Sequence, residues 1–141
     1  MQIVGEKFNL KVIPCYTDMS QPLGKTSGLW CEVNEAWEAL NGKISSDLKS
    51  VVFYLCQEII GKTNYKKINK VIEDGTAAIK FQEMIFNQGG NQNVFINKSV
   101  NDPKFKIEIS SKQNGYINSF ETKAIGFALA ELGANKIFKD D

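Results

Sequence analysis

The sequence Thr17-Asp18-Met19-Ser20-Gln21-Pro22-Leu23-Gly24, with the segment that follows it, decides how this chain is expected to fold. The apolar run before it, Leu10–Tyr16, is typical of a short buried strand. Pro22 disfavours helix at the residue before it, so the motif itself should form a turn. The next apolar pattern predicts an amphipathic helix over Leu29–Leu40, which Asn41-Gly42 should end. A strand, a tight loop and a helix make half of a βαβ unit, and ligands of α/β sheets bind at such strand ends.

The rest of the chain is expected to supply further helices and one hairpin. Ser45-Ser46-Asp47 predicts a helix start, and the helix that follows it, Leu48–Ile60, is apolar around most of its girth, which is typical of deep burial. Two more helices are expected near 64–73 and 77–87. Apolar and charged residues then alternate over 104–109 before an Asn-Gly turn, which predicts a β-hairpin, and a last helix should run from Thr122 to Leu132.

A polar, glycine-rich stretch, Gln88–Asn93, is expected to separate two units. Residues 1–90 would belong to an α/β domain, and residues 91–141 would begin a smaller α+β domain made of the hairpin and its helix. The predicted fold class is therefore α/β, with one strand and several helices in the first unit. Ile137-Phe138 could begin a further strand.

Length and composition describe a soluble globular protein of 141 residues, with 43% hydrophobic and 23% charged residues. A net charge of +1 gives no electrostatic basis for binding nucleic acid or an acidic membrane. No apolar run approaches the ~20 residues that span a bilayer, and no signal-peptide pattern is present. We therefore expect a cytoplasmic protein with three reduced cysteines. The chain has no histidine, which excludes a Ser-His or Cys-His nucleophile pair and a His-ligated zinc site within it.

These motifs, in this order, resemble the thymidine and pyrimidine-nucleoside phosphorylase family. In that family a strand ends in a TDM-x-QPLG loop, which a G-N-A-L-E-V-x-E-A helix and a glycine follow. Two departures stand out: Leu29-Trp30-Cys31 replaces the usual Asn-Ala-Leu, and Pro14 interrupts the apolar strand. The resemblance covers almost the whole chain and is carried by TDMSQPLG, Gly28, Glu32-Val33, Glu35-Ala36, Asn41-Gly42, Asp74-Gly75, Lys80-Phe81, Gln88-Gly89-Gly90, Gly115-Tyr116-Ile117, Ile125-Gly126 and Leu132-Gly133-Ala134.

The resemblance implies part of a transferase of nucleoside salvage, in which phosphate displaces the base from a pyrimidine nucleoside to give a pentose 1-phosphate. The intact enzyme would be a cytoplasmic homodimer. In the family the phosphate loop, the catalytic histidine and the base-binding residues lie upstream of the matched part. No catalytic or cofactor-binding residue is therefore expected in this chain, which alone should be inactive. The alternative is a non-catalytic module, or a subunit that needs a separate N-terminal chain; a phosphoribosyltransferase related by fold fits the motifs less well.

The resemblance also implies a potassium ion near the loop. The family's ligands there map onto the backbone carbonyls of Leu23 and Thr26 and onto the carboxylate of Glu35. A hard cation prefers such oxygen ligands. The family's other ligands come from the phosphate loop, so the positions carried by this chain should bind potassium weakly. Spacing alone favours a solvated face for the acidic row Glu32, Glu35 and Glu38 over a cation site.

Three other features have both a functional and a structural interpretation. Trp30 and Trp37 could form a base-stacking platform, but their place in the apolar stripe favours core packing. Asp18 could act as a catalytic acid, although a side chain that caps the following turn is favoured. A cluster of lysines could bind phosphate, but without interleaved aromatics it is more typical of a solvated face. Its members are Lys62, Lys66, Lys67 and Lys70.

Overall fold

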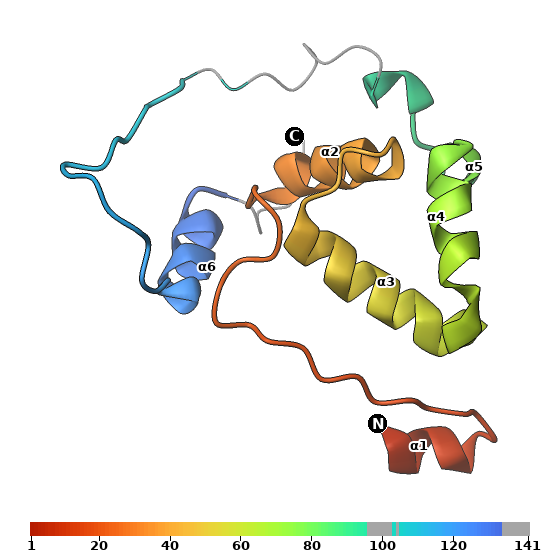
Figure 1. The fold of residues 1–141 in the computed structure, drawn as a ribbon. Coiled ribbons are helices and arrows are strands. Elements are labelled where there is room, and N and C mark those ends of the chain that lie inside the picture. The colour runs from red at the N-terminus through yellow and green to blue at the C-terminus, as the bar shows by residue number, and fades with distance from the viewer. Residues whose placement is uncertain (96–102, 104, 134–141) are drawn as a thin grey trace, which may run out of the picture.

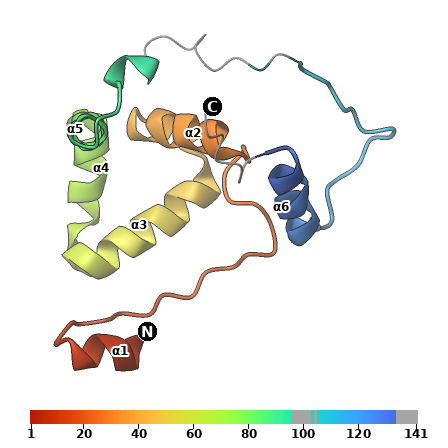
Figure 2. The ribbon, with the colours of Figure 1, turned by 180° about the vertical axis from the view of Figure 1, so that it is seen from behind.

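The structure is a computed structural model of the chain, and it describes residues 1–95, 103 and 105–133. Within α2 to α5, α3 packs on α4, α4 on α5, and α5 on α2 (Figure 1). Seen from both sides, α1 lies apart from this group at the far end of an extended segment (Figure 2). The helices are α1 (Gln2–Lys7), α2 (Leu29–Leu40), α3 (Ser46–Ile60), the 3-10 turn η1 (Lys62–Asn64), α4 (Tyr65–Glu73), α5 (Thr76–Asn87), the 3-10 turn η2 (Gln92–Phe95) and α6 (Thr122–Glu131).

The described residues contain no β-strand, so the predicted α/β fold class is not confirmed. The strand predicted at Leu10–Tyr16 is absent, and so is the hairpin predicted around Asn114-Gly115; both segments are irregular chain. The two differences from the prediction have the same physical reason. A strand exists only when a neighbour takes up its N–H and C=O groups, and neither segment lies beside such a neighbour in the described part of the chain. The possible strand at Ile137-Phe138 lies outside the described residues.

The helices begin and end where local sequence signals put them. α2 runs from Leu29 to Leu40 as predicted and is followed by Gly42, whose positive φ of 87° suits a helix end. Ser45 is the N-cap residue of α3, and Gly61 with φ 94° follows its last residue. These signals act within a few residues, and for that reason they can be read without knowing the tertiary structure.

An aromatic cluster forms the centre of the helical group. Trp37 of α2 stacks on Phe95 of η2 with ring centroids 5.1 Å apart, and Trp30 stacks on the same ring at 5.7 Å. Phe81 of α5 completes the cluster at 5.6 Å from Phe95. The structural interpretation of the two tryptophans is thus confirmed. Phe95 follows the predicted unit boundary, yet it packs against α2 and α5.

The predicted deep burial of α3 is wrong. Phe53 is buried, but Leu55 is 38% exposed and Ile59 is 83% exposed. The whole chain exposes 12433 Å², whereas a compact protein of 15.8 kDa exposes about 7,300 Å² by surface scaling. Apolar faces that the sequence predicts to be covered therefore meet solvent in this structure. The described helices are all too short or too polar to cross a lipid bilayer.

Candidate functional site

Acidic side chains hold the loop that leads into α2. Asp47, in the first turn of α3, accepts the Gly24 N–H at 2.8 Å, and Glu32 accepts the Gly28 N–H at 2.9 Å. Asp18 accepts the Ser20 N–H at 2.8 Å, which confirms its predicted role as the cap of the turn. The loop has no sheet to satisfy its backbone, so the carboxylates serve as acceptors for its N–H groups.

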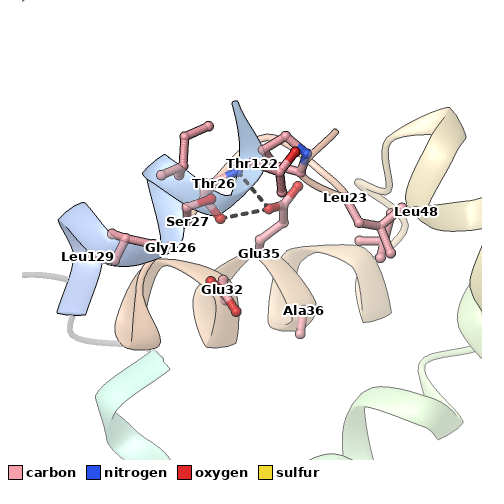
Figure 3. A pocket seen from close by; sticks show the side chains of 12 residues that line it. Leu23, Thr26, Ser27, Glu32, Glu35, Ala36, Leu48, Thr122, Gly126 and Leu129 are labelled. Atoms are coloured by element: carbon pink, nitrogen blue, oxygen red, sulfur yellow. Dashed lines mark hydrogen bonds between the residues drawn. The ribbon is translucent and has the colours of Figure 1, made fainter. Parts of the chain in front are cut away.

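Glu35 makes the largest set of these contacts. Its Oε1 accepts the Lys25 N–H at 2.8 Å, and its Oε2 accepts both the N–H of Thr26 at 3.1 Å and the hydroxyl of Thr26 at 2.6 Å. Figure 3 shows the Glu35 side chain reaching from α2 toward Thr26. A carboxylate has about four acceptor positions, so these bonds leave one, on Oε1, for a further partner.

Gly24 makes the closest approach of the loop to Glu35. A Cβ at this position would lie 2.7 Å from Oε1 and 2.9 Å from Oε2 of Glu35, closer than carbon and oxygen can stand. The φ of Gly24 is also +79°, a left-handed conformation that side chains disfavour. Both observations require glycine here. Because glycine has no side chain, the space beside the Glu35 carboxylate stays free of a Cβ.

Hydrogen bonding keeps these carboxyl groups ionised. The Thr26 hydroxyl lowers the pKa of Glu35, while partial burial and the nearby charge of Asp47 act in the opposite direction. The nearby Ser45 side chain, although its buried Oγ makes no hydrogen bond of ordinary geometry, and then the Gly24 N–H lower the pKa of Asp47 to about 2. At neutral pH the loop therefore lies among negative charges, an environment that favours a bound cation over an anion.

We expect acid to release the loop from Asp47. The pKa of Asp47 is lower in the folded state than its ordinary value of 3.8, so its stabilising effect is present above about pH 4 and is lost as the pH falls from there toward about 2. The amide resonance of Gly24 should report this change with a midpoint near pH 2. Far-UV circular dichroism recorded in parallel would separate loop release from loss of the helices. A midpoint near pH 4 would show that the Asp47 bond is not formed in solution.

A hollow of about 390 Å³ lies beside Glu35, between the loop, α2, α3 and α6. Leu23, Thr26 and Glu35, the three residues that the resemblance implies as potassium ligands, all line it. The opposite wall comes from α6 through Ile125, Leu129 and others, and the Thr122 hydroxyl donates to the Ser20 carbonyl at 3.1 Å. The hollow thus brings the expected positions together and adds a wall from the far end of the chain.

The acidic row of α2 does not form one site. Glu38 lines a second hollow of about 440 Å³ that shares Glu35 with the first but not Glu32. In the ranges that the structure describes, no group of three or more His, Cys, Asp or Glu side chains is placed to hold a metal. A cation beside Glu35 would therefore depend on backbone and hydroxyl oxygens as well as on this carboxylate, which is a donor set suited to potassium.

Two contributors to the site were not predicted as such from the sequence. Asp47 was expected only to help start a helix, and Thr122 only to begin another. Asp47 lies 23 residues from its partner Gly24, and Thr122 lies 102 residues from Ser20. Contacts over such separations leave no local pattern, although an Asp in a first helical turn does indicate an available acceptor.

Known proteins similar to this chain include the following three enzymes. Thymidine phosphorylase of Metamycoplasma hominis is 35% identical over 147 aligned residues, which cover 98% of this chain and 54% of that protein. Pyrimidine-nucleoside phosphorylase of Staphylococcus haemolyticus (strain JCSC1435) is 30% identical over 155 residues, covering 100% of this chain and 35% of that protein. The corresponding enzyme of Staphylococcus aureus (strain bovine RF122 / ET3-1) is 29% identical over 147 residues, covering 98% and 34%.

No family model and no solved structure matches the chain. The chain spans about half the length of the Metamycoplasma hominis enzyme and about a third of the staphylococcal ones. The similar proteins are named for the activity that the resemblance implies. Nearly the whole chain is homologous to the C-terminal part of the thymidine and pyrimidine-nucleoside phosphorylases.

Proposed function

We propose that this chain is the C-terminal portion of a pyrimidine-nucleoside phosphorylase. In that reaction the bond between the sugar and the base breaks, a bond between the sugar and a phosphate oxygen forms, and the products are the free base and a pentose 1-phosphate. Homology over 98% of the chain supports this assignment. The structural observation that carries it is the convergence of Leu23, Thr26 and Glu35 on one hollow.

The part of this chain in such an enzyme is to present the loop and not to perform the chemistry. No histidine is present, and no residue of the chain is assigned to phosphate or to the base. Potassium fits the loop, because Glu35 keeps one acceptor position and Gly24 leaves room beside it. The carbonyls of Leu23 and Thr26 and the carboxylate of Glu35 would hold the ion, which would supply a fixed positive charge that ties the loop to the rest of the enzyme.

The α/β fold belongs to the same proposal. Leu10–Tyr16 and the segment 104–117 would become strands once the remaining part of the enzyme supplies neighbouring strands. Their side chains are apolar and solvent-exposed in this structure: Leu10, Ile13, Phe105, Ile107 and Ile109 are 63%, 43%, 86%, 86% and 93% exposed. The assembled enzyme is proposed to be a cytoplasmic homodimer.

A second candidate is a non-catalytic module, or a subunit that requires a separate N-terminal chain. The observation that favours it is the large exposed apolar surface, since such a surface is typical of a protein that binds another polypeptide. Both candidates predict that the isolated chain is inactive. They differ in whether the chain can take the place of the corresponding part of an active relative.

We expect no phosphorolysis from the isolated chain and measurable phosphorolysis from a chimera. In the chimera this chain replaces the aligned segment of the Metamycoplasma hominis thymidine phosphorylase, which is 35% identical to it. Release of thymine from thymidine in the presence of phosphate would be followed by chromatography, with the unmodified enzyme as the positive control. Turnover by the isolated chain would refute the proposal that this chain presents the loop without performing the chemistry. A chimera that melts cooperatively yet shows no turnover would favour the non-catalytic module.

Potassium should raise the melting temperature of the chimera relative to tetramethylammonium at equal ionic strength. Glu35→Gln should abolish this rise, because it removes the one formal charge that the chain offers to the ion. Glu83→Gln is the matched control, since Glu83 pairs with Lys80 on the exposed side of α5 and such pairs contribute little. A potassium effect of undiminished size in Glu35→Gln would remove Glu35 from the proposed site.

A further inference from the structure

We propose that Asp47 is a positioning residue for the cation site, because its bond to the Gly24 N–H fixes the direction of the Leu23 carbonyl. The proposal rests on the proposed function and adds a residue to the same site. Asp47 does not touch the ion in this account. It acts through the peptide unit that joins Leu23 to Gly24.

The contact itself is short and bridges two separate parts of the chain. Oδ2 of Asp47 lies 2.8 Å from the Gly24 nitrogen, 23 residues away, and the bond is partly buried. Asp47 is the second residue of α3, a helix of 15 residues that also packs against η1 and α4. The acceptor therefore stands on a rigid element, while the donor belongs to an irregular loop.

Because the peptide unit is planar, the Asp47 bond to the Gly24 N–H also fixes the orientation of the Leu23 carbonyl. None of the described peptide bonds is cis. In a trans peptide the C=O of one residue and the N–H of the next lie in one plane and point in opposite directions. An Asp47 bond to the Gly24 N–H consequently sets the Leu23 C=O in the direction away from Asp47.

The peptide unit between Leu23 and Gly24 needs a hydrogen-bond partner to fix it, because Gly24 is conformationally free. Gly24 has φ +79°, and glycine has access to more backbone conformations than any other residue, so this peptide unit could otherwise turn over. Glu35 fixes the next two peptide units through the N–H groups of Lys25 and Thr26. Asp47 fixes the peptide unit before these two, and that unit contains the Leu23 carbonyl, which the resemblance implies as a potassium ligand.

The test uses the chimera described above, labelled with ¹³C and ¹⁵N, and follows the Leu23 carbonyl carbon as potassium chloride replaces tetramethylammonium chloride at constant ionic strength. Asp47→Asn keeps an oxygen acceptor and should keep the potassium-induced shift. Asp47→Leu has no acceptor and should lose it. Asp74→Leu is the control, because Asp74 accepts the Thr76 N–H at 3.0 Å at the start of α5, outside the site, and its loss should leave the shift unchanged.

A second measurement does not require potassium. Hydrogen exchange of the Gly24 amide should become faster by about tenfold in Asp47→Leu, since the amide loses its acceptor, and should change little in Asp47→Asn. Equal potassium-induced shifts in the wild type and Asp47→Leu would overturn the positioning role while leaving the cation site in place. Unchanged exchange of Gly24 in Asp47→Leu would overturn it too. A chimera carrying the wild-type sequence of this chain, in which potassium moves no loop resonance, would instead refute the cation site, whatever the exchange of Gly24 shows.

Discussion

Replacing Phe95 by alanine should lower the free energy of unfolding of the helical group by about 3–5 kcal/mol, the usual cost of removing a buried phenylalanine. Phe95 is 5% exposed, and its ring contacts Trp30, Trp37 and Phe81. Urea unfolding followed by tryptophan fluorescence measures this change directly, because both tryptophans of the chain lie in the cluster. The same experiment examines the predicted boundary at residue 90, since a residue of an independent second unit would not stabilise the first.

Phe86→Ala is the matched control for this prediction. Phe86 lies one residue before the end of α5 and is 66% exposed, so its removal creates no cavity and should cost about 1 kcal/mol or less. Equal losses in the two variants would mean that the ring of Phe95 does not pack in the cluster. The first unit would then end before η2, as the polar stretch Gln88–Asn93 suggested.

Helices were predictable from the sequence to the extent that their signals are local. The limits of α2 follow from Gly28, an apolar stripe and Asn41-Gly42, all within about fifteen residues of one another. Whether Leu10–Tyr16 forms a strand cannot be decided from its own sequence in this way. A strand requires a neighbouring strand, and the local pattern does not contain one. Apolar content predicts that a segment is covered in the assembled protein, and it does not show which element covers it.

In the candidate site too, contacts between neighbouring residues were predictable from the sequence, and contacts between distant segments were not. The cap made by Asp18 spans two residues, and the sequence predicted it from the turn chemistry alone. The convergence of Leu23, Thr26 and Glu35 was expected from the resemblance to a family, and no rule of spacing would have given it. Neither the local sequence pattern nor the resemblance predicted the Asp47 bond to Gly24, since this bond depends on the path of the loop between two helices.

The contact between Gly24 and Glu35 gives the second large effect. Gly24→Ala should lower the free energy of unfolding by about 3 kcal/mol, of which about 1–2 kcal/mol is the cost of a left-handed alanine. The rest arises because the new methyl group would stand 2.7 Å from Oε1 of Glu35. The end of a glutamate side chain can usually move aside at little cost. Here it cannot do so without giving up its bonds to Lys25 and Thr26.

Gly75→Ala separates the two contributions, because Gly75 has the same φ of +79° and nothing within 4 Å of the added Cβ. It should show the conformational cost alone, measured by urea unfolding under the same conditions. A double-mutant cycle then isolates the contact. In a Glu35→Ala background the methyl group meets no carboxylate, so Gly24→Ala should cost no more there than Gly75→Ala does in the wild type. If Gly24→Ala were equally costly with and without the Glu35 carboxylate, the loop would not lie against that side chain, and the proposed arrangement of the site would be wrong.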